Sequence, residues 1–168
     1  MSVALPLLLG FAMLCAEVFL REALAADAWA PDLLTVTLVW LGAHRPAASG
    51  AWIAALLGVM ADGFAGSPLG VHALHAVLLY GAAAILARQV RLHGLIGNLL
   101  LGLGGGFVGL FLLALICRVA LGDTTLAARI GALLVPRVMV VALAAPLLLP
   151  LFSRLDALLV RRPDADRL

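Results

Sequence analysis

One segment constrains this chain more than any other. From Leu95 to Cys117 it runs for 23 residues without a charged side chain. A helix needs roughly 17–25 apolar residues to cross the hydrocarbon layer of a bilayer. The whole chain agrees, because 65 % of its 168 residues are hydrophobic and 12 % are charged, against about 25 % charged in soluble domains. These values exclude a soluble or disordered chain and predict a protein that crosses the membrane several times.

Six apolar segments are expected to cross the bilayer. Their continuous runs favour helices, since the strands of a membrane barrel would alternate apolar and polar residues. The expected spans are Val3–Leu20, Pro31–Ala43 with a start reaching back to Ala28, Gly50–Ala65, Leu69–Ala87, Leu95–Cys117 and Gly131–Phe152. The expected fold class is therefore an all-α integral membrane protein, with six transmembrane helices in one bundle over residues 1–152.

The second segment is the shortest of the six. Pro31 is expected at its first helical position, where the missing N–H costs nothing. Asp32 lies where the helix dipole favours an anion. The first segment is expected to stay in the protein, because no Arg or Lys precedes it as in a signal peptide.

The arginines predict the orientation in the membrane. With six spans, seven arginines lie on the same side of the membrane as both termini, namely Arg45, Arg88, Arg91, Arg154, Arg161, Arg162 and Arg167. The other side carries three, Arg21, Arg118 and Arg129. Cytoplasmic loops are enriched in basic residues, so both termini are expected in the cytoplasm. Residues 153–168 are expected to form a short amphipathic, basic tail along the membrane surface.

A glycine-rich stretch in the fifth segment contains a formal GxGxxG pattern. A dinucleotide site needs that pattern between a strand and a helix, and here it lies inside a continuous apolar run. Small residues four apart instead let membrane helices approach closely. We therefore expect two packing faces, Gly102 with Gly106 and Gly105 with Gly109.

Asp62 is the acid that lies well inside a span, where an ionisable group is costly and usually has a partner. Arg137 in the sixth segment is the expected partner. A substrate or proton site, or a contact with a partner protein, are the alternatives. Glu17 is expected to pair with Arg21 four residues later.

No catalytic or metal site is predicted. His72 and His75 share a helix face. A metal site would need a third ligand, for which Asp62 is the only obvious candidate, so hydrogen bonds within the bundle are favoured. The sequence contains no GxSxG and no HExxH, and we expect neither an enzyme nor a cofactor. The basic residues are spread between apolar segments, which gives no surface for nucleic acid.

Three stretches carry a resemblance to a known family. They are Pro31-Asp32-Leu33-Leu34, then Arg45-Pro46, then the block from Gly58 through Asp62 to Gly66-Ser67-Pro68-Leu69-Gly70. Together they resemble the rod shape-determining protein MreD over residues 31–87. From Arg88 onward only length and hydrophobicity match. The resemblance makes Pro31, Arg45, Asp62, Gly66, Pro68 and Gly70 candidates for structural or partner contacts.

The resemblance implies an inner-membrane scaffold of the bacterial cell-elongation complex, without catalysis. Its most direct partner would be MreC, with RodA, the elongation penicillin-binding protein and MreB in the same complex and membrane lipids around it. It also implies a fold similar to the S component of energy-coupling-factor transporters. The alternative is therefore a substrate-binding subunit of a vitamin transporter, which should carry an outer pocket lined by converging polar groups.

Overall fold

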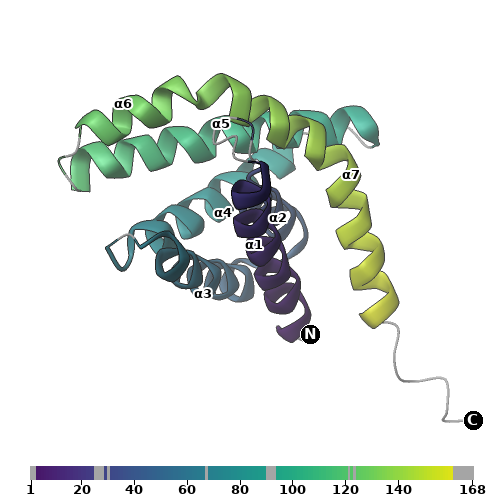
Figure 1. The fold of residues 1–168 in the computed structure, drawn as a ribbon. Coiled ribbons are helices and arrows are strands. Elements are labelled where there is room, and N and C mark those ends of the chain that lie inside the picture. Colours follow the sequence, from purple (N-terminus) through teal and green to yellow (C-terminus); the bar gives the residue numbers. More distant parts are fainter. Residues whose placement is uncertain are drawn as a thin grey trace, which may run out of the picture.

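The structure is a computed structural model that describes residues 3–24, 29, 31–66, 68–89, 94–120, 122 and 124–160. Every regular element in these residues is a helix (Figure 1). The helices are α1 (Ala4–Leu24), α2 (Leu33–His44), α3 (Ala47–Ala65), α4 (Val71–Gln89), α5 (Leu95–Ala120), α6 (Thr124–Ala132) and α7 (Leu134–Val160). The all-helical part of the expected fold class is confirmed.

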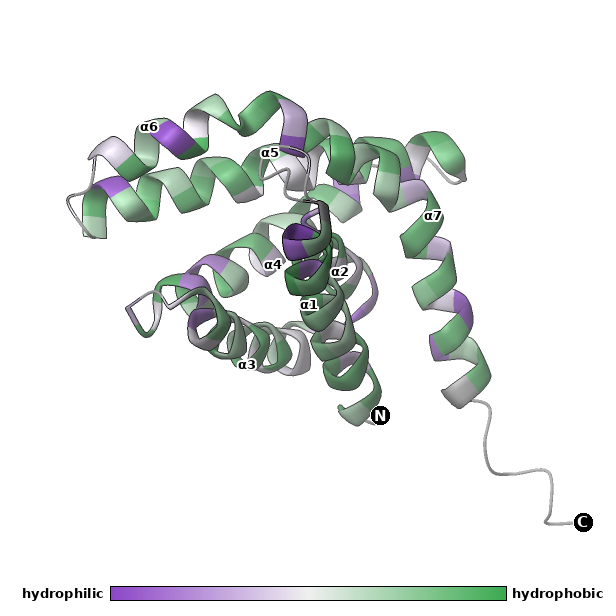
Figure 2. Cartoon of the chain, viewed as in Figure 1, coloured by the Kyte–Doolittle hydropathy of each residue, from purple (hydrophilic) through white to green (hydrophobic). Residues whose placement is uncertain are grey.

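Helix α2 forms the centre of the bundle. It contacts α1, α3, α4, α5 and α7, and its residues from Leu33 through Gly42 are all buried. The core around it includes Leu38, Trp40 and Leu57. Large apolar side chains also cover the outside, and Figure 2 shows hydrophobic residues on outward as well as inward faces. Such an exterior is suited to lipid and not to water.

Five helices in the described residues, α1, α3, α4, α5 and α7, are long and apolar enough to cross a membrane. The expected second span forms the helix α2, but its 12 residues rise about 18 Å, less than the ~30 Å hydrocarbon layer. Helix length alone therefore supports five crossings. Ala28, where this span was expected to begin, lies outside the described residues.

The start of α2 differs from the expectation in one detail. Asp32 is the N-cap, and its Oδ1 accepts a hydrogen bond from the Thr35 backbone N–H at 2.9 Å. The Thr35 hydroxyl donates to Asp32 Oδ2 at 2.8 Å. Pro31 therefore precedes the cap and does not occupy the first helical position. The expected anion at the helix start is present, in the role of a cap.

Most of α6 lies between the fifth and sixth expected spans, where no helix was expected. This helix packs against α5 and α7 and buries none of its residues. Figure 1 shows it running back along α5. Its threonines and Arg129 keep its hydropathy low, so it does not stand out as an apolar run.

Helix α7 continues past Phe152, the expected end of the last span, to Val160. The first half of the expected tail is thus part of this helix, and residues 161–168 lie outside the described part. Pro146 and Pro150 sit within α7, and the helix changes direction along its length (Figure 1). Proline lacks the N–H of the helical ladder and bends a helix.

Candidate functional site

Helices α3 and α4 form a tightly packed hairpin at Gly58. A Cβ atom on Gly58 would lie 2.4 Å from the Cα of Ala73 and 2.5 Å from the carbonyl oxygen of His72. These neighbours are backbone atoms of α4, so no side chain fits without separating the helices. Gly58 is therefore a point where the backbones of α3 and α4 approach closely.

The connection between these helices also depends on glycine. Gly66 ends α3 with φ +61°, and Gly70 precedes α4 with φ +102°. Both lie in the left-handed region that glycine adopts without steric cost. Pro68 lies between them, and its carbonyl accepts from the Val71 N–H at 3.4 Å. Ser67 of the same block lies outside the described residues.

Asp62 connects the end of α3 with the beginning of α4 across the turn of this hairpin. Its Oδ2 accepts a hydrogen bond from the Gly70 N–H at 2.7 Å, and its Oδ1 accepts from the His72 N–H at 2.7 Å. The His72 Nδ1 lies 3.0 Å from the same Oδ1. The first N–H groups of a helix lack partners within it, and a carboxylate there also interacts favourably with the dipole. Asp62 of α3 thus caps the N-terminus of α4, although it is only 1 % exposed.

The ion pair expected between Asp62 and Arg137 stays a prediction. The contacts described above hold Asp62 to the beginning of α4. Arg137 of α7 lines a cavity together with Glu17 and His72, and it is near enough to Glu17 for their charges to interact.

Glu17 caps the beginning of α2 from outside that helix. Its Oε2 accepts a hydrogen bond from the Leu34 N–H at 3.0 Å, next to the Thr35 N–H that Asp32 accepts. Its Oε1 lies 2.5 Å from the Arg21 guanidinium, which confirms the expected pair four residues apart. Two carboxylates therefore meet the positive end of α2, and Arg21 balances part of their charge.

Both histidines take part in hydrogen bonds inside the bundle, as expected. His75 is buried, and its Nε2 lies 2.9 Å from the carbonyl oxygen of Gly109 in α5. His72 is held by Asp62. Among the residues that the structure describes, no three His, Cys, Asp or Glu side chains gather as metal ligands would.

A cavity of about 280 Å³ opens where these polar groups meet. Residues of α1, α3, α4, α5 and α7 line it, together with residues at the start of α2. Its titratable groups are Glu17, Arg21, Glu22, Asp32, His72, His75 and Arg137. The contacts given above for Glu17, Asp32, His72 and His75 hold helices to one another. The arrangement therefore stabilises the bundle, and it leaves an open space beside these groups whose wall is partly charged and largely apolar.

The opposite end of α2 is fixed to α7. Trp40 Nε1 donates to Ser153 Oγ at 3.2 Å, and His44 Nε2 lies 3.3 Å from the same oxygen. Arg45 forms an ion pair with Asp156 at 2.5 Å, and its guanidinium lies 5.9 Å from the centre of the Trp40 ring. We call these five residues the α2–α7 clasp. Sequence analysis missed it, because the partners are more than 100 residues apart and no spacing pattern joins them.

The glycines of α5 face two different neighbours. A Cβ on Gly102 would lie 2.4 Å from the Ala145 Cβ, so this face, which includes Gly106, meets α7. A Cβ on Gly105 would lie 2.3 Å from the Val39 Cγ2 in α2. Gly109 follows on that second face, against α2 and α4. Helix α5 thus uses both small-residue faces to pack inside the bundle.

The sequence of this chain matches the model of a known protein family. The family model of the rod shape-determining protein MreD matches residues 1–157. The chain belongs to the MreD family. No curated protein and no solved structure matches it. The match covers almost the whole chain, so the resemblance of residues 31–87 extends over the N-terminal helix and over α5 to α7 as well.

MreD proteins are structural membrane proteins with a role in determining rod shape. The family and the long apolar helices together make this chain a multi-pass protein of the inner membrane. Within this MreD chain, the Gly58–Gly70 block has a structural explanation. It packs, turns and caps the α3–α4 hairpin.

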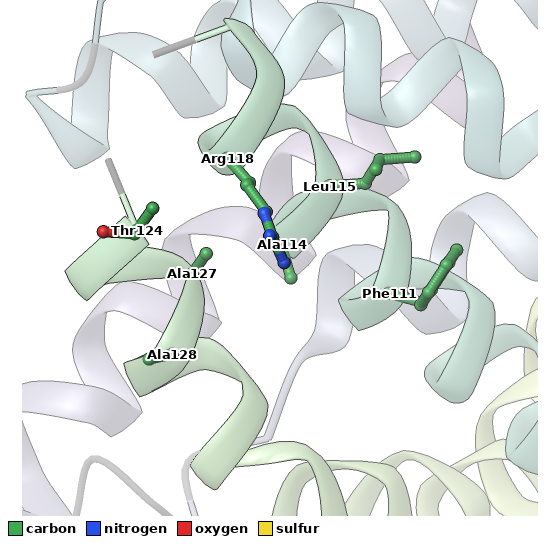
Figure 3. Close-up of a pocket in the computed structure, with 7 residues that line it drawn as sticks. All are labelled: Phe111, Ala114, Leu115, Arg118, Thr124, Ala127 and Ala128. Carbon is green, nitrogen blue, oxygen red and sulfur yellow. The ribbon is translucent and has the colours of Figure 1, made fainter. Parts of the chain in front are cut away.

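One further cavity lies outside the residues that sequence analysis selected. It measures about 400 Å³ between α5 and α6. Figure 3 shows Arg118 of α5 across from the small side chains Ala127 and Ala128 of α6. The sequence gives little indication of this cavity, because alanines near a single arginine are common in any helix.

Proposed function

We propose that this protein is an inner-membrane scaffold of the bacterial cell-elongation complex, where it helps to organise the synthesis of sidewall peptidoglycan. The observation that carries the proposal is the MreD family match over residues 1–157. The bundle supports it, because the carboxylates of Glu17, Asp32 and Asp62 cap helices inside the protein. Polar groups used in this way favour a rigid body that binds other proteins over one that performs a reaction.

The partners proposed are those that the family resemblance implies. MreC is the most direct, and RodA, the elongation penicillin-binding protein and MreB belong to the same complex. The test is co-purification of the tagged, full-length chain from native membranes after mild crosslinking. MreC should be recovered with wild-type protein. Recovery no greater than that of an unrelated membrane protein of equal abundance would contradict the proposal.

We further propose six crossings with both termini in the cytoplasm and a fold similar to a transporter S component. The arginine distribution supports this orientation. The short helix α2 suits a sixth crossing, because its start is capped by Glu17 and its end is held by the α2–α7 clasp. Backbone and charged groups inside a membrane need such internal partners. A reporter fused after Leu168 should be active only in the cytoplasm, and activity only in the periplasm would refute the topology.

One observation favours the second candidate, a substrate-binding subunit of a small-molecule transporter. Charged side chains from several helices converge on the largely apolar lining of the 280 Å³ cavity, as expected of a ligand pocket. Depletion separates the two candidates. Loss of vitamin uptake in cells that keep their rod shape would support the transporter subunit, and rounding with normal uptake would support the scaffold.

A further inference from the structure

A third cavity lies at the other end of the bundle, between the α2–α3 turn and the end of α4. It measures about 330 Å³. Small residues form part of its wall, among them Gly42, Ala84 and Ala87, and His44, Arg45 and Arg88 bring the polar groups. Among its described lining residues none is acidic. This cavity therefore offers positive charge beside an apolar wall.

The two arginines differ in how far their charge is already used. Arg45 is 5 % exposed in its side chain and pairs with Asp156 of the α2–α7 clasp. Its Nε is nevertheless buried without a hydrogen-bond partner among the described residues. Arg88 is exposed on α4, and its charge acts on the Tyr80 hydroxyl, which itself donates to the Pro46 carbonyl oxygen at 3.1 Å. Arg88 thus lies close to the α2–α3 turn and completes a basic pocket.

The depth of the cavity indicates the kind of anion. Arg88 is the penultimate residue of α4, which ends at Gln89, so the cavity lies where this span leaves the hydrocarbon layer. Phospholipid phosphates lie at that depth, and basic pockets between transmembrane helices bind acidic lipid headgroups. Guanidinium groups match phosphate oxygens in geometry and charge.

The surface below the cavity indicates that the anion carries acyl chains. Leu78 and Ile85 are 43 % and 62 % exposed. They are seven residues apart on α4, and Arg88 follows three residues after Ile85, so all three share one helix face. An acyl chain lying along Leu78 and Ile85 would place its headgroup beside Arg88. A soluble phosphate would make no use of this apolar track.

We propose that this cavity, formed by the α2–α3 turn and the end of α4, is a binding site for an anionic phospholipid such as phosphatidylglycerol. Arg88 binds the headgroup, the buried Arg45 adds positive charge to the wall of the pocket, and the exposed face of α4 holds an acyl chain. The site is independent of the proposed scaffold role. It is distinct from the 280 Å³ cavity at the start of α2.

The test is native mass spectrometry of the full-length chain in detergent, titrated with phosphatidylglycerol or phosphatidylcholine of equal chain length. Wild type should retain phosphatidylglycerol preferentially. Arg88→Gln should bind it about fivefold more weakly, which matches about 1 kcal/mol for one basic residue at the membrane surface. The matched control is Arg118→Gln, which removes an exposed arginine of α5 and should bind as wild type does.

A second variant separates a built pocket from general surface charge. Ala87→Leu keeps every charge but fills the cavity, and it should weaken phosphatidylglycerol binding as Arg88→Gln does. Melting temperatures near that of wild type would show that the variants fold. Equal lipid retention in Arg88→Gln and Arg118→Gln would overturn the proposal. Displacement of the lipid by excess inorganic phosphate alone would overturn the choice of lipid and assign the pocket to a soluble anion.

Discussion

Removing the carboxylate of Asp62 is expected to loosen the α3–α4 hairpin. The carboxylate accepts hydrogen bonds from two backbone N–H groups, of Gly70 and His72, each at 2.7 Å. Hydrogen bonds to a charged group contribute about 1.5–3 kcal/mol each. At the lower value, chosen because water can reach the turn, Asp62→Ala should lower the free energy of unfolding by about 3 kcal/mol. For a chain of this length that corresponds to a melting temperature about 6–12 °C lower.

Two companion variants decide which interaction carries the effect. Asp62→Asn keeps one carbonyl oxygen as an acceptor, so the cap predicts about half of the loss. An ion pair with Arg137 would make Asp62→Asn as damaging as Asp62→Ala, because the cation would lose its counter-charge. The exchange of Asp62→Arg with Arg137→Asp should restore stability only if the pair dominates.

The assay is thermal unfolding of the purified chain in detergent, followed by the loss of the monodisperse peak in size-exclusion chromatography. A melting temperature of Asp62→Ala within about 2 °C of wild type, less than 1 kcal/mol, would refute the capping argument. Recovery in the exchanged variant would refute it too, in favour of the ion pair.

Three further predictions concern helix contacts. Arg45→Gln and Asp156→Asn should each destabilise the α2–α7 clasp and lower the melting temperature. The double variant should melt no lower than the less stable of the two single variants, and a double-mutant cycle of melting temperatures checks this. Gly105→Leu should lower the free energy of unfolding by at least the ~1–3 kcal/mol that overpacking a core costs. The control is Gly81→Leu, whose Cβ would meet nothing within 4 Å and which should melt near wild type. Equal losses in the two variants would contradict the packing argument. Ala12 is exposed on α1, so Ala12→Leu should leave the melting temperature unchanged. A marked fall would show that the side of α1 that carries Ala12 packs inside the bundle.

The sequence predicted the elements that rest on long apolar runs. Helices α3, α4 and α5 lie within a few residues of their expected bounds, because mainly apolar runs of about 20 residues have few folds available in a membrane. Helix α6 was missed because its hydropathy resembles that of a loop. The end of α7 was placed too early because Ser153 and Arg154 resemble the beginning of a separate amphipathic element at the membrane surface, whereas the same helix continues through them.

The candidate site could be predicted only in part. Sequence reasoning recognised that Asp62 needs a partner, and the family motif selected the glycines around it. Two of its observed partners are backbone N–H groups, which every residue except proline carries, so no residue pattern reveals them. The pair of Arg45 and Asp156 forms only when α2 and α7 pack together, and one sequence contains no record of that distant contact.

The most direct test of the proposed function is depletion of this protein in its native, rod-shaped host, with the ratio of cell length to width measured by microscopy. The scaffold account predicts that the ratio falls toward that of a sphere and that the full-length chain restores it. It predicts poorer restoration by Asp62→Ala at equal expression. Rods of unchanged shape after complete depletion would contradict the account.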